Sequence, residues 1–213
     1  MKAMIVPVTA FAQNCSILWC EETMQGAVVD PGGDIAEVEA AAKRKGVEIV
    51  KILLTHGHVD HAAGTLALKK VFDVPVEGPH EEDAFLLKEL PETARGYGFP
   101  ACESFTPDRW LKEGDTVSFG NVTLEVLHCP GHTPGHVVFF DRPDKLAVVG
   151  DVLFQGSVGR TDFPRGNAKD LVSSIRNKLF PLGDEVVFIP GHGPLSSFGD
   201  ERKSNPYVGD RAF

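Results

Sequence analysis

The chain has little cysteine, no long apolar run and a deficit of positive charge. Only 4 of its 213 residues are cysteines, and they are too scattered for a disulfide framework, so we expect reduced thiols and a cytoplasmic protein. No segment approaches the roughly 20 consecutive apolar residues that a membrane span requires. We therefore do not expect a membrane among its partners.

The net charge and the absence of repeats bear on the ligand class and on the number of domains. Lys and Arg number 21 against 30 Asp and Glu, which makes the formal net charge −9. This balance argues against nucleic acid as the main ligand, because phosphate binding depends on clustered basic residues. The sequence contains no internal repeat, low-complexity tract or Ser/Gly linker that would mark a boundary. We expect one domain over residues 1–213.

Apolar segments rich in β-branched residues alternate with helical patterns along the chain. We expect strands at 5–9, 16–19, 27–29, 47–54, 116–119, 122–127, 137–140, 145–149 and 185–189. We expect helices at 35–45, ending at Gly46, and at 60–72, 81–90 and 170–180. Strands outnumber helices, and the helices are spread through the chain, which favours sheet layers covered by helices. The order of the strands stays open.

The run THGHVDH at positions 55–61 lies where an expected buried strand leads into a helix. Three imidazoles and one carboxylate within six positions are a poor way to build a core, because an imidazole is costly to bury without partners. His56 and His58 are two residues apart, so in extended backbone they project to the same side and could bind one ion. The run therefore indicates metal ligands rather than a solvated polar turn.

Three more expected strands end in a glycine-bounded loop with a residue of ligand type. These loops are HCPGHTPGH at 128–136, which carries His132, VVGD at 148–151, which carries Asp151, and IPGHGP at 189–194, which carries His192. Each of these residues alone is more often a turn or capping residue. Together with the histidine run, they indicate a metal centre.

This pattern resembles the metallo-β-lactamase superfamily, from the early strands to Pro194. The resemblance implies an α+β protein built as a four-layer αββα sandwich, with a metal site at one edge of the two sheets. It implies two divalent metal ions. The first would be bound by His56, His58 and His132, the second by Asp60, His61 and His192, and both by a bridging Asp151.

The resemblance also implies supporting roles. Asp60 and Asp151 are expected to be the catalytic carboxylates. His136 is expected to support the ligands. Asp30 either bonds a ligand imidazole or simply forms a turn before Pro31. The other two histidines, at positions 80 and 128, are expected on the surface or in loops.

The ligand types bear on the metal and on the reaction. Nitrogen and oxygen ligands without cysteine suit zinc, which we expect first, and also iron or manganese. β-Lactamases of this fold commonly have a cysteine where this chain has Asp151. A carboxylate there could bridge two cations, which favours the branch of hydrolases with two metals. Such a pair of ions would acidify a water for attack at neutral pH.

Within the superfamily the pattern is most similar to the type II glyoxalases, in their short bacterial form without a C-terminal helical domain. This resemblance implies hydrolysis of a small-molecule glutathione thioester, S-lactoylglutathione, to lactate and glutathione. The leaving thiol has a pKa of about 8.5, so no protein acid is required. Arg160 stands where a glutathione-contacting lysine is found in the longer enzymes, and an ion pair with Asp162 is the alternative.

Persulfide dioxygenases are the main rival, because they share the histidine run and the GRTDF segment at 159–163. They use one iron, on positions that match His56, His132 and Asp151. The glycine-rich surroundings of His192 favour a second metal and therefore the hydrolase. A nuclease of this fold would need a basic exosite or an RNA-binding arm, for which the sequence has no candidate. The oligomeric state is not predicted.

Overall fold

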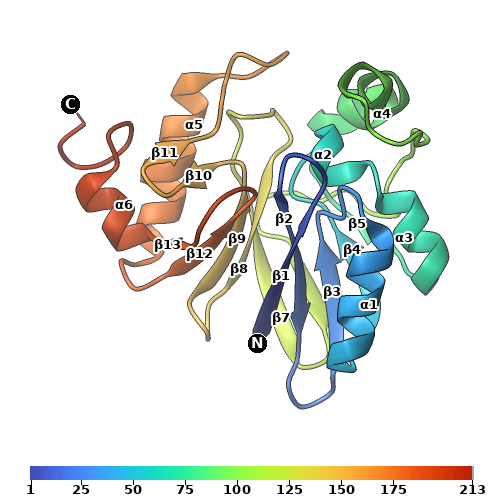
Figure 1. Ribbon diagram of the computed structural model, residues 1–213. Coiled ribbons are helices and arrows are strands. Elements are labelled where there is room, and N and C mark those ends of the chain that lie inside the picture. Colours follow the sequence, from blue (N-terminus) through green and yellow to red (C-terminus); the bar gives the residue numbers. More distant parts are fainter. Residues whose placement is uncertain (213) are drawn as a thin grey trace.

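The computed structural model describes residues 1–212, whose main strands form two facing β-sheets (Figure 1). The first sheet has the order β1-β2-β3-β4-β5, and the second has the order β13-β12-β9-β8-β7-β6. The first contains β1 (Lys2–Val8), β2 (Gln13–Trp19), β3 (Gln25–Val29), β4 (Glu48–Leu53) and β5 (Val76–Glu77). The second contains β6 (Thr116–Phe119), β7 (Val122–His128), β8 (Val137–Asp141), β9 (Leu146–Gly150), β12 (Val187–Pro190) and β13 (Ser196–Ser197). A small hairpin of β10 (Leu153–Phe154) and β11 (Ser157–Val158) follows β9.

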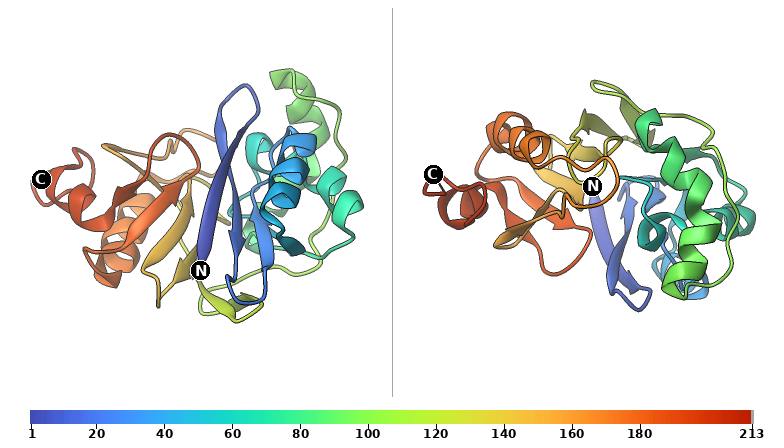
Figure 2. Two further views of the ribbon diagram at one scale, coloured as in Figure 1. Left: turned by 60° about the horizontal axis from the view of Figure 1, so that its bottom comes forward. Right: turned by 90° about the horizontal axis from the view of Figure 1, so that it is seen from above.

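Helices cover the two outer faces of the sheet pair, as Figure 2 shows from two further directions. On the side of the first sheet lie α1 (Ile35–Lys45), α3 (Thr65–Phe72) and α4 (Ala84–Tyr97). On the side of the second sheet lie α5 (Ala168–Ser174) and α6 (Phe198–Ser204). The short α2 (Val59–Ala62) sits at the end of β4. The expected four-layer αββα sandwich is confirmed.

Three apolar cores hold these layers together. The central one joins the inner faces of the sheets, where Leu53 meets Phe139, Val148 and Ile189. The other two lie between each sheet and its helices, with Leu68 on one side and Phe188 on the other. Strands such as β8 are buried along their whole length, which explains their nearly continuous apolar sequence.

The sequence pattern locates two elements to the residue, α1 and β6. Helix α1 covers 35–45 as expected and ends at Gly46, whose φ of 70° suits a residue without a Cβ. Three of the four expected helices were wrong in extent. The helix expected at 60–72 is two helices that meet near Gly64, where a Cβ would lie 2.5 Å from the Pro31 carbonyl oxygen.

The second wrong extent concerns α4, which begins at Ala84 after a 3-10 turn at Glu81–Asp83 and continues to Tyr97 where loop was expected. Its apolar stripe buries Leu87, Leu90 and Ala94, so packing outweighs the internal Pro91. The helix expected at 170–180 begins at 168 and passes into a π-helical turn at Ile175–Leu179.

Two parallel strand pairs determine which loops meet. β3 pairs in parallel with β4, and β9 pairs in parallel with β12. The carboxyl ends of parallel neighbours lie at one edge of a sheet, so Asp30 falls beside the histidine run, and Asp151 beside His192. Along residues 1–212, no helix is both long enough and apolar enough to cross a membrane.

Candidate metal centre

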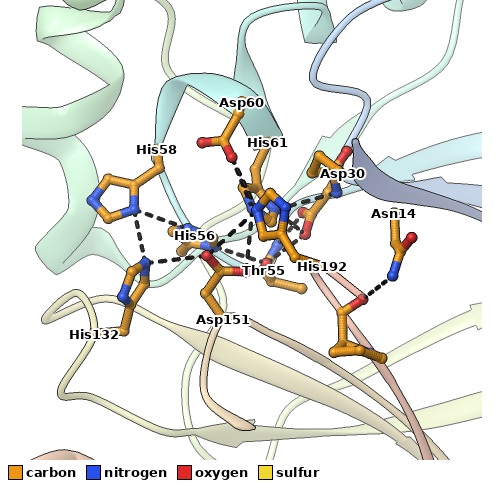
Figure 3. Close-up of polar contacts among 12 residues, drawn as sticks. Asn14, Asp30, Thr55, His56, His58, Asp60, His61, His132, Asp151 and His192 are labelled. Carbon is orange, nitrogen blue, oxygen red and sulfur yellow. Dashed lines mark hydrogen bonds and ion pairs between the residues drawn. The ribbon is translucent and has the colours of Figure 1, made fainter. Parts of the chain in front are cut away.

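All seven predicted ligands converge at one edge of the sheet pair, in the space between the loops (Figure 3). They fall into two groups, each with ligand atoms within 4.8 Å of one another. We call His56, His58 and His132 the first ligand group and Asp60, His61 and His192 the second ligand group. Asp151, which follows β9, lies between them.

The first ligand group is a cluster of three imidazole nitrogens. Nδ1 of His58 lies 3.1 Å from Nε2 of His56 and 2.9 Å from Nε2 of His132. Nitrogens at these separations fit around one ion with metal–nitrogen bonds of about 2.0–2.1 Å. His56 is fully buried and His132 nearly so, which leaves the cluster little access to water.

Hydrogen bonds from outside the cluster determine which ring nitrogen faces inward. His56 Nδ1 donates to the Thr55 hydroxyl at 3.0 Å, because that hydroxyl itself donates to Asp30. His132 Nδ1 donates to the Arg160 carbonyl oxygen at 2.7 Å. Both rings therefore turn an unprotonated Nε2 toward His58 Nδ1, and nitrogen lone pairs gathered in this way suit the coordination of a cation.

The second ligand group combines imidazoles with a carboxylate. His61 Nδ1 donates to Asp30 at 2.9 Å, and His192 Nδ1 donates to the Phe11 carbonyl oxygen at 3.2 Å. The inward Nε2 atoms of these two rings lie 3.7 and 3.1 Å from Oδ2 of Asp60. The side chain of His192 is 28% exposed and Asp60 is also only partly buried, so this group is more open to solvent than the first, in which His58 alone is partly exposed.

Asp151 touches both groups. Its Oδ1 lies 3.4 Å from His61 Nε2, and its Oδ2 lies 3.6 Å from His132 Nε2 and 3.7 Å from His192 Nε2. Oδ1 of Asp151 and Nε2 of His61 are both buried without a hydrogen-bond partner. Buried polar atoms are rarely left unpaired, so these two atoms fit metal coordination. Gly191 permits the close approach, because a Cβ there would lie 2.0 Å from Asp151 Oδ1.

The pKa values divide the two groups. Burial lowers the pKa of His56 and His132, and it lowers that of His58 to about 3, with repulsion from His132 adding to the effect on His58. Burial also opposes charge on His61 and His192, but the carboxylates of Asp60 and Asp151 raise both pKa values above the ordinary range. The first group is therefore a set of neutral donors, while the second holds protons that a metal would displace.

The two carboxylates of the centre are ionised. Burial disfavours their charge, yet His61 lowers the pKa of both Asp60 and Asp151. Ionised oxygens beside neutral imidazole nitrogens are a donor set that suits zinc, iron or manganese. The residues present therefore fit two divalent cations.

Two predicted supporting residues lie directly behind the ligands. Asp30 accepts hydrogen bonds from the Thr55 backbone and hydroxyl as well as from His61. It is therefore more than a turn residue, although its carbonyl oxygen does accept a hydrogen bond from the Gly32 amide across a tight turn at 2.9 Å. His136 is fully buried, stacks on His56 with a centroid distance of 4.7 Å, and accepts a hydrogen bond from the Asp151 amide at 3.1 Å.

Arg160 lies at the mouth of the centre and is engaged with its neighbours. Its guanidinium forms two hydrogen bonds to Asp162, at 2.9 and 2.7 Å, and lies over the ring of Phe163. The ion pair with Asp162 is therefore present. Both side chains are about two-thirds exposed, at 67% and 66%, and an exposed pair of this kind contributes little to stability. The ring of Phe163 packs against His58 and His132.

Sequence reasoning missed several residues that build the centre. The backbone amide of Asn14 donates to the Gly191 carbonyl oxygen, and its side-chain amide donates to the carbonyl oxygens of Pro190 and Gly193. Asn14 therefore holds the loop that carries His192 (Figure 3). Thr55 stands inside the histidine run but was given no role. No local pattern marks Asn14, since its partners are more than 170 residues away. His80 and His128, expected in surface or loop positions, stack on each other outside the two groups.

Comparison with known proteins places this geometry in a family. The sequence profile of the metallo-β-lactamase superfamily matches residues 8–192. A protein of Haemophilus influenzae, the hydroxyacylglutathione hydrolase GloC, is 45% identical over 213 residues, with 100% of each chain covered.

Two solved structures agree closely. The BLEG-1 B3 metallo-β-lactamase has a TM-score of 0.90 at 32% identity, over 97% of this chain and 99% of that one. TTHA1623 in a di-iron-bound form has a TM-score of 0.87 at 35% identity, over 96% of this chain and 100% of that one.

Proposed function

Because the chain belongs to the metallo-β-lactamase superfamily, we propose that it is a metal-dependent thioester hydrolase that cleaves a hydroxyacylglutathione to a hydroxy acid and glutathione. The observation that carries this proposal is Asp151, which lies within 3.7 Å of imidazoles from both ligand groups. A carboxylate shared by two groups suits a pair of ions. The similarity to a hydroxyacylglutathione hydrolase over the whole chain supports the thioester as substrate.

We assign one ion to each ligand group, with Asp151 between them. Zinc is our first candidate, and iron or manganese would suit the same nitrogen and oxygen donors. The di-iron form of TTHA1623 supports two ions in this fold. When bound, two such ions acidify a water and polarise a carbonyl oxygen.

The chain's own residues would supply orientation and charge. Asp60 and Asp151 are the catalytic carboxylates in this proposal: both are ionised, and Asp60 stands beside His61 and His192, where it would orient the nucleophile. The leaving thiolate has a pKa of about 8.5, so the carbon–sulfur bond would break without a proton from the protein.

We propose that Arg160 contacts the anionic glutathione part of the substrate. Asp162 is its present partner, and a substrate carboxylate would have to replace Asp162 in an exposed pair. Only a small free energy opposes that exchange.

The four cysteines are free thiols, which agrees with our proposal of a cytoplasmic enzyme. We also propose that residues 1–213 act as one domain.

The test is a thioesterase assay under nitrogen and under air. Purified protein loaded with zinc, iron or manganese should release free thiol from S-lactoylglutathione at the same rate in both atmospheres. Elemental analysis of the same preparation should find about two ions per chain. Consumption of glutathione persulfide that requires oxygen, together with no thioester cleavage, would establish the mononuclear dioxygenase instead.

A further inference from the structure

Asp83 is a buried carboxylate beside the metal centre that contacts none of the seven predicted ligands. It ends the 3-10 turn that leads into α4 and is fully buried. Nothing in the local sequence separates it from the acidic residues Glu81 and Glu82 next to it. Its significance comes from the segments that it joins.

Three hydrogen bonds from two distant loops end on this carboxylate. The Gly57 amide donates to Oδ2 at 2.9 Å, and the Thr133 hydroxyl donates to the same oxygen at 2.8 Å. The Gly135 amide donates to Oδ1 at 2.6 Å. Gly57 stands between His56 and His58, and Thr133 follows His132 directly. One side chain thus joins the two loops that carry the first ligand group.

The shape of the contact reinforces the hydrogen bonds. A Cβ on Gly135 would lie 2.5 Å from the Asp83 amide nitrogen and 2.7 Å from its carboxyl carbon. The same loop is held a second time, because the His80 amide donates to the Gly135 carbonyl oxygen at 3.0 Å. The loop after His132 therefore packs closely against the start of α4, with no space for a side chain at position 135.

We propose that Asp83 is a positioning residue for the first ligand group: it holds the loops of residues 56–58 and 132–135 at the spacing that brings His58 Nδ1 to 3.1 Å from His56 Nε2 and 2.9 Å from His132 Nε2. The inference rests on the proposed metal site and not on the thioester reaction. A carboxylate suits this task because all three partners are donors. An amide in its place would turn an NH₂ group toward at least one of these donors.

The chain offers a matched control in Glu201. Its carboxylate is 2% exposed and also accepts three hydrogen bonds, from the Gly156 amide at 2.8 Å, the Asn205 side-chain amide at 2.8 Å and the Ser196 hydroxyl at 2.5 Å. It joins α6 to β13 and to the β10–β11 hairpin. None of its three partners stands next to a predicted ligand in the sequence. The substitution Glu201→Gln therefore disrupts a buried carboxylate with three hydrogen-bond donors, as Asp83→Asn does, but leaves the loops of the metal centre in place.

The experiment compares Asp83→Asn with Glu201→Gln in full-length, metal-loaded protein. Zinc affinity is measured by competition with a chromophoric chelator, and ligand geometry by the visible absorption of the cobalt(II)-loaded protein. We expect Asp83→Asn to weaken zinc binding at the first ligand group by about 10-fold or more and to change the cobalt spectrum. Glu201→Gln should leave both unchanged, whatever it does to the melting temperature of the metal-free protein.

Thr133→Val keeps the inference testable if Asp83→Asn does not fold. That variant removes one of the three hydrogen bonds and leaves the carboxylate in place, so we expect a smaller loss of zinc affinity and a smaller spectral change. The inference is overturned if the folded variants bind zinc within twofold of the parent with the parent spectrum, or if Glu201→Gln weakens zinc as much as Asp83→Asn. Neither readout depends on the substrate, so a failure of the thioesterase assay would leave this result standing.

Discussion

The two ligand groups of the centre use the same residue type in opposite electrostatic settings. In the first group the imidazoles face one another, and burial lowers the pKa of all three. In the second group two imidazoles face carboxylates, and their pKa values are raised. In the second group the carboxylates of Asp60 and Asp151 outweigh burial, whereas in the first group burial outweighs the attraction of Asp151 for His132.

The support behind the groups differs as well. The first group is backed by the buried Thr55 and Asp83, and by the carbonyl oxygen of Arg160, whose side chain is exposed. The second depends on the Phe11 carbonyl oxygen and on Asn14 across the edge of the sheets, and it is more open to solvent. We therefore expect the first group to bind the tighter ion.

The largest effect should come from Asp151→Ala, which removes the one side chain that the two groups share. We expect loss of most bound metal and a fall of thioesterase activity on the order of 10³-fold. Elemental analysis and a thiol-release assay on the same preparation check this. Full metal content in that variant would show that Asp151 does not bridge the groups.

His192→Ala should distinguish the contribution of the second ligand group from that of the first. The variant lacks one ligand of the second group and keeps every member of the first, so we expect it to retain about one ion per chain and to lose activity on the order of 10²-fold. Metal analysis and steady-state kinetics measure the two quantities. Unchanged thioesterase activity with a single ion would show that one group suffices for the reaction.

Metal uptake by the two groups should depend differently on pH. A metal must displace the protons that His61 and His192 hold below their raised pKa values, so the affinity of the second group falls as pH falls through that range, by about tenfold per pH unit for each proton displaced. The first group is already neutral near neutral pH, and its affinity should stay nearly constant between about pH 6 and pH 8. Calorimetric zinc titrations of metal-free protein across this range measure both affinities, and equal slopes would contradict the distinction.

The smallest effect should come from Arg160→Ala, at the mouth of the centre. We expect KM for S-lactoylglutathione to rise a few-fold, about 3–10-fold, with kcat less affected, because the contact is with a part of the substrate that does not react. Arg142→Ala is the matched control, since Arg142 also forms two hydrogen bonds to a carboxylate, that of Glu125, and lies over a ring, that of Phe140. An unchanged KM in Arg160→Ala, or an equal rise in Arg142→Ala, would remove Arg160 from substrate binding.

Local pattern was sufficient for much of the fold. The helix at 35–45 was predicted to the residue because its charges, its alanines and Gly46 all lie within one segment. The break between α2 and α3 was missed, and it coincides with a close approach of Gly64 to Pro31, 33 residues away in the sequence, that no local pattern reveals. The extension of α4 past Pro91 was missed for the same reason, since packing and not propensity sustains it.

The supporting residues show the same limit. Asp30 was expected either to bond a ligand or to form a turn, and only the parallel pairing of β3 with β4 brings it to Thr55 and His61. Asn14 and Asp83 were not selected, because an asparagine and an aspartate are common residues whose meaning depends on what lies opposite them. Ligand chemistry is visible in a sequence, whereas the acceptors that orient the ligands are visible only in space.

By itself, the sequence determined the donors: five histidines and two aspartates stand in or beside the loops that follow strands, with spacing that suits cations. Their division into two groups was an expectation from the family resemblance, and the structure brings the same residues together. Tertiary structure alone decided which ring nitrogen of each histidine faces inward and which rings hold protons. The reason is physical. Each of these outcomes depends on distances of about 3 Å between atoms from separate strands, and such distances follow from the register and packing of two sheets, which no local stretch of sequence encodes.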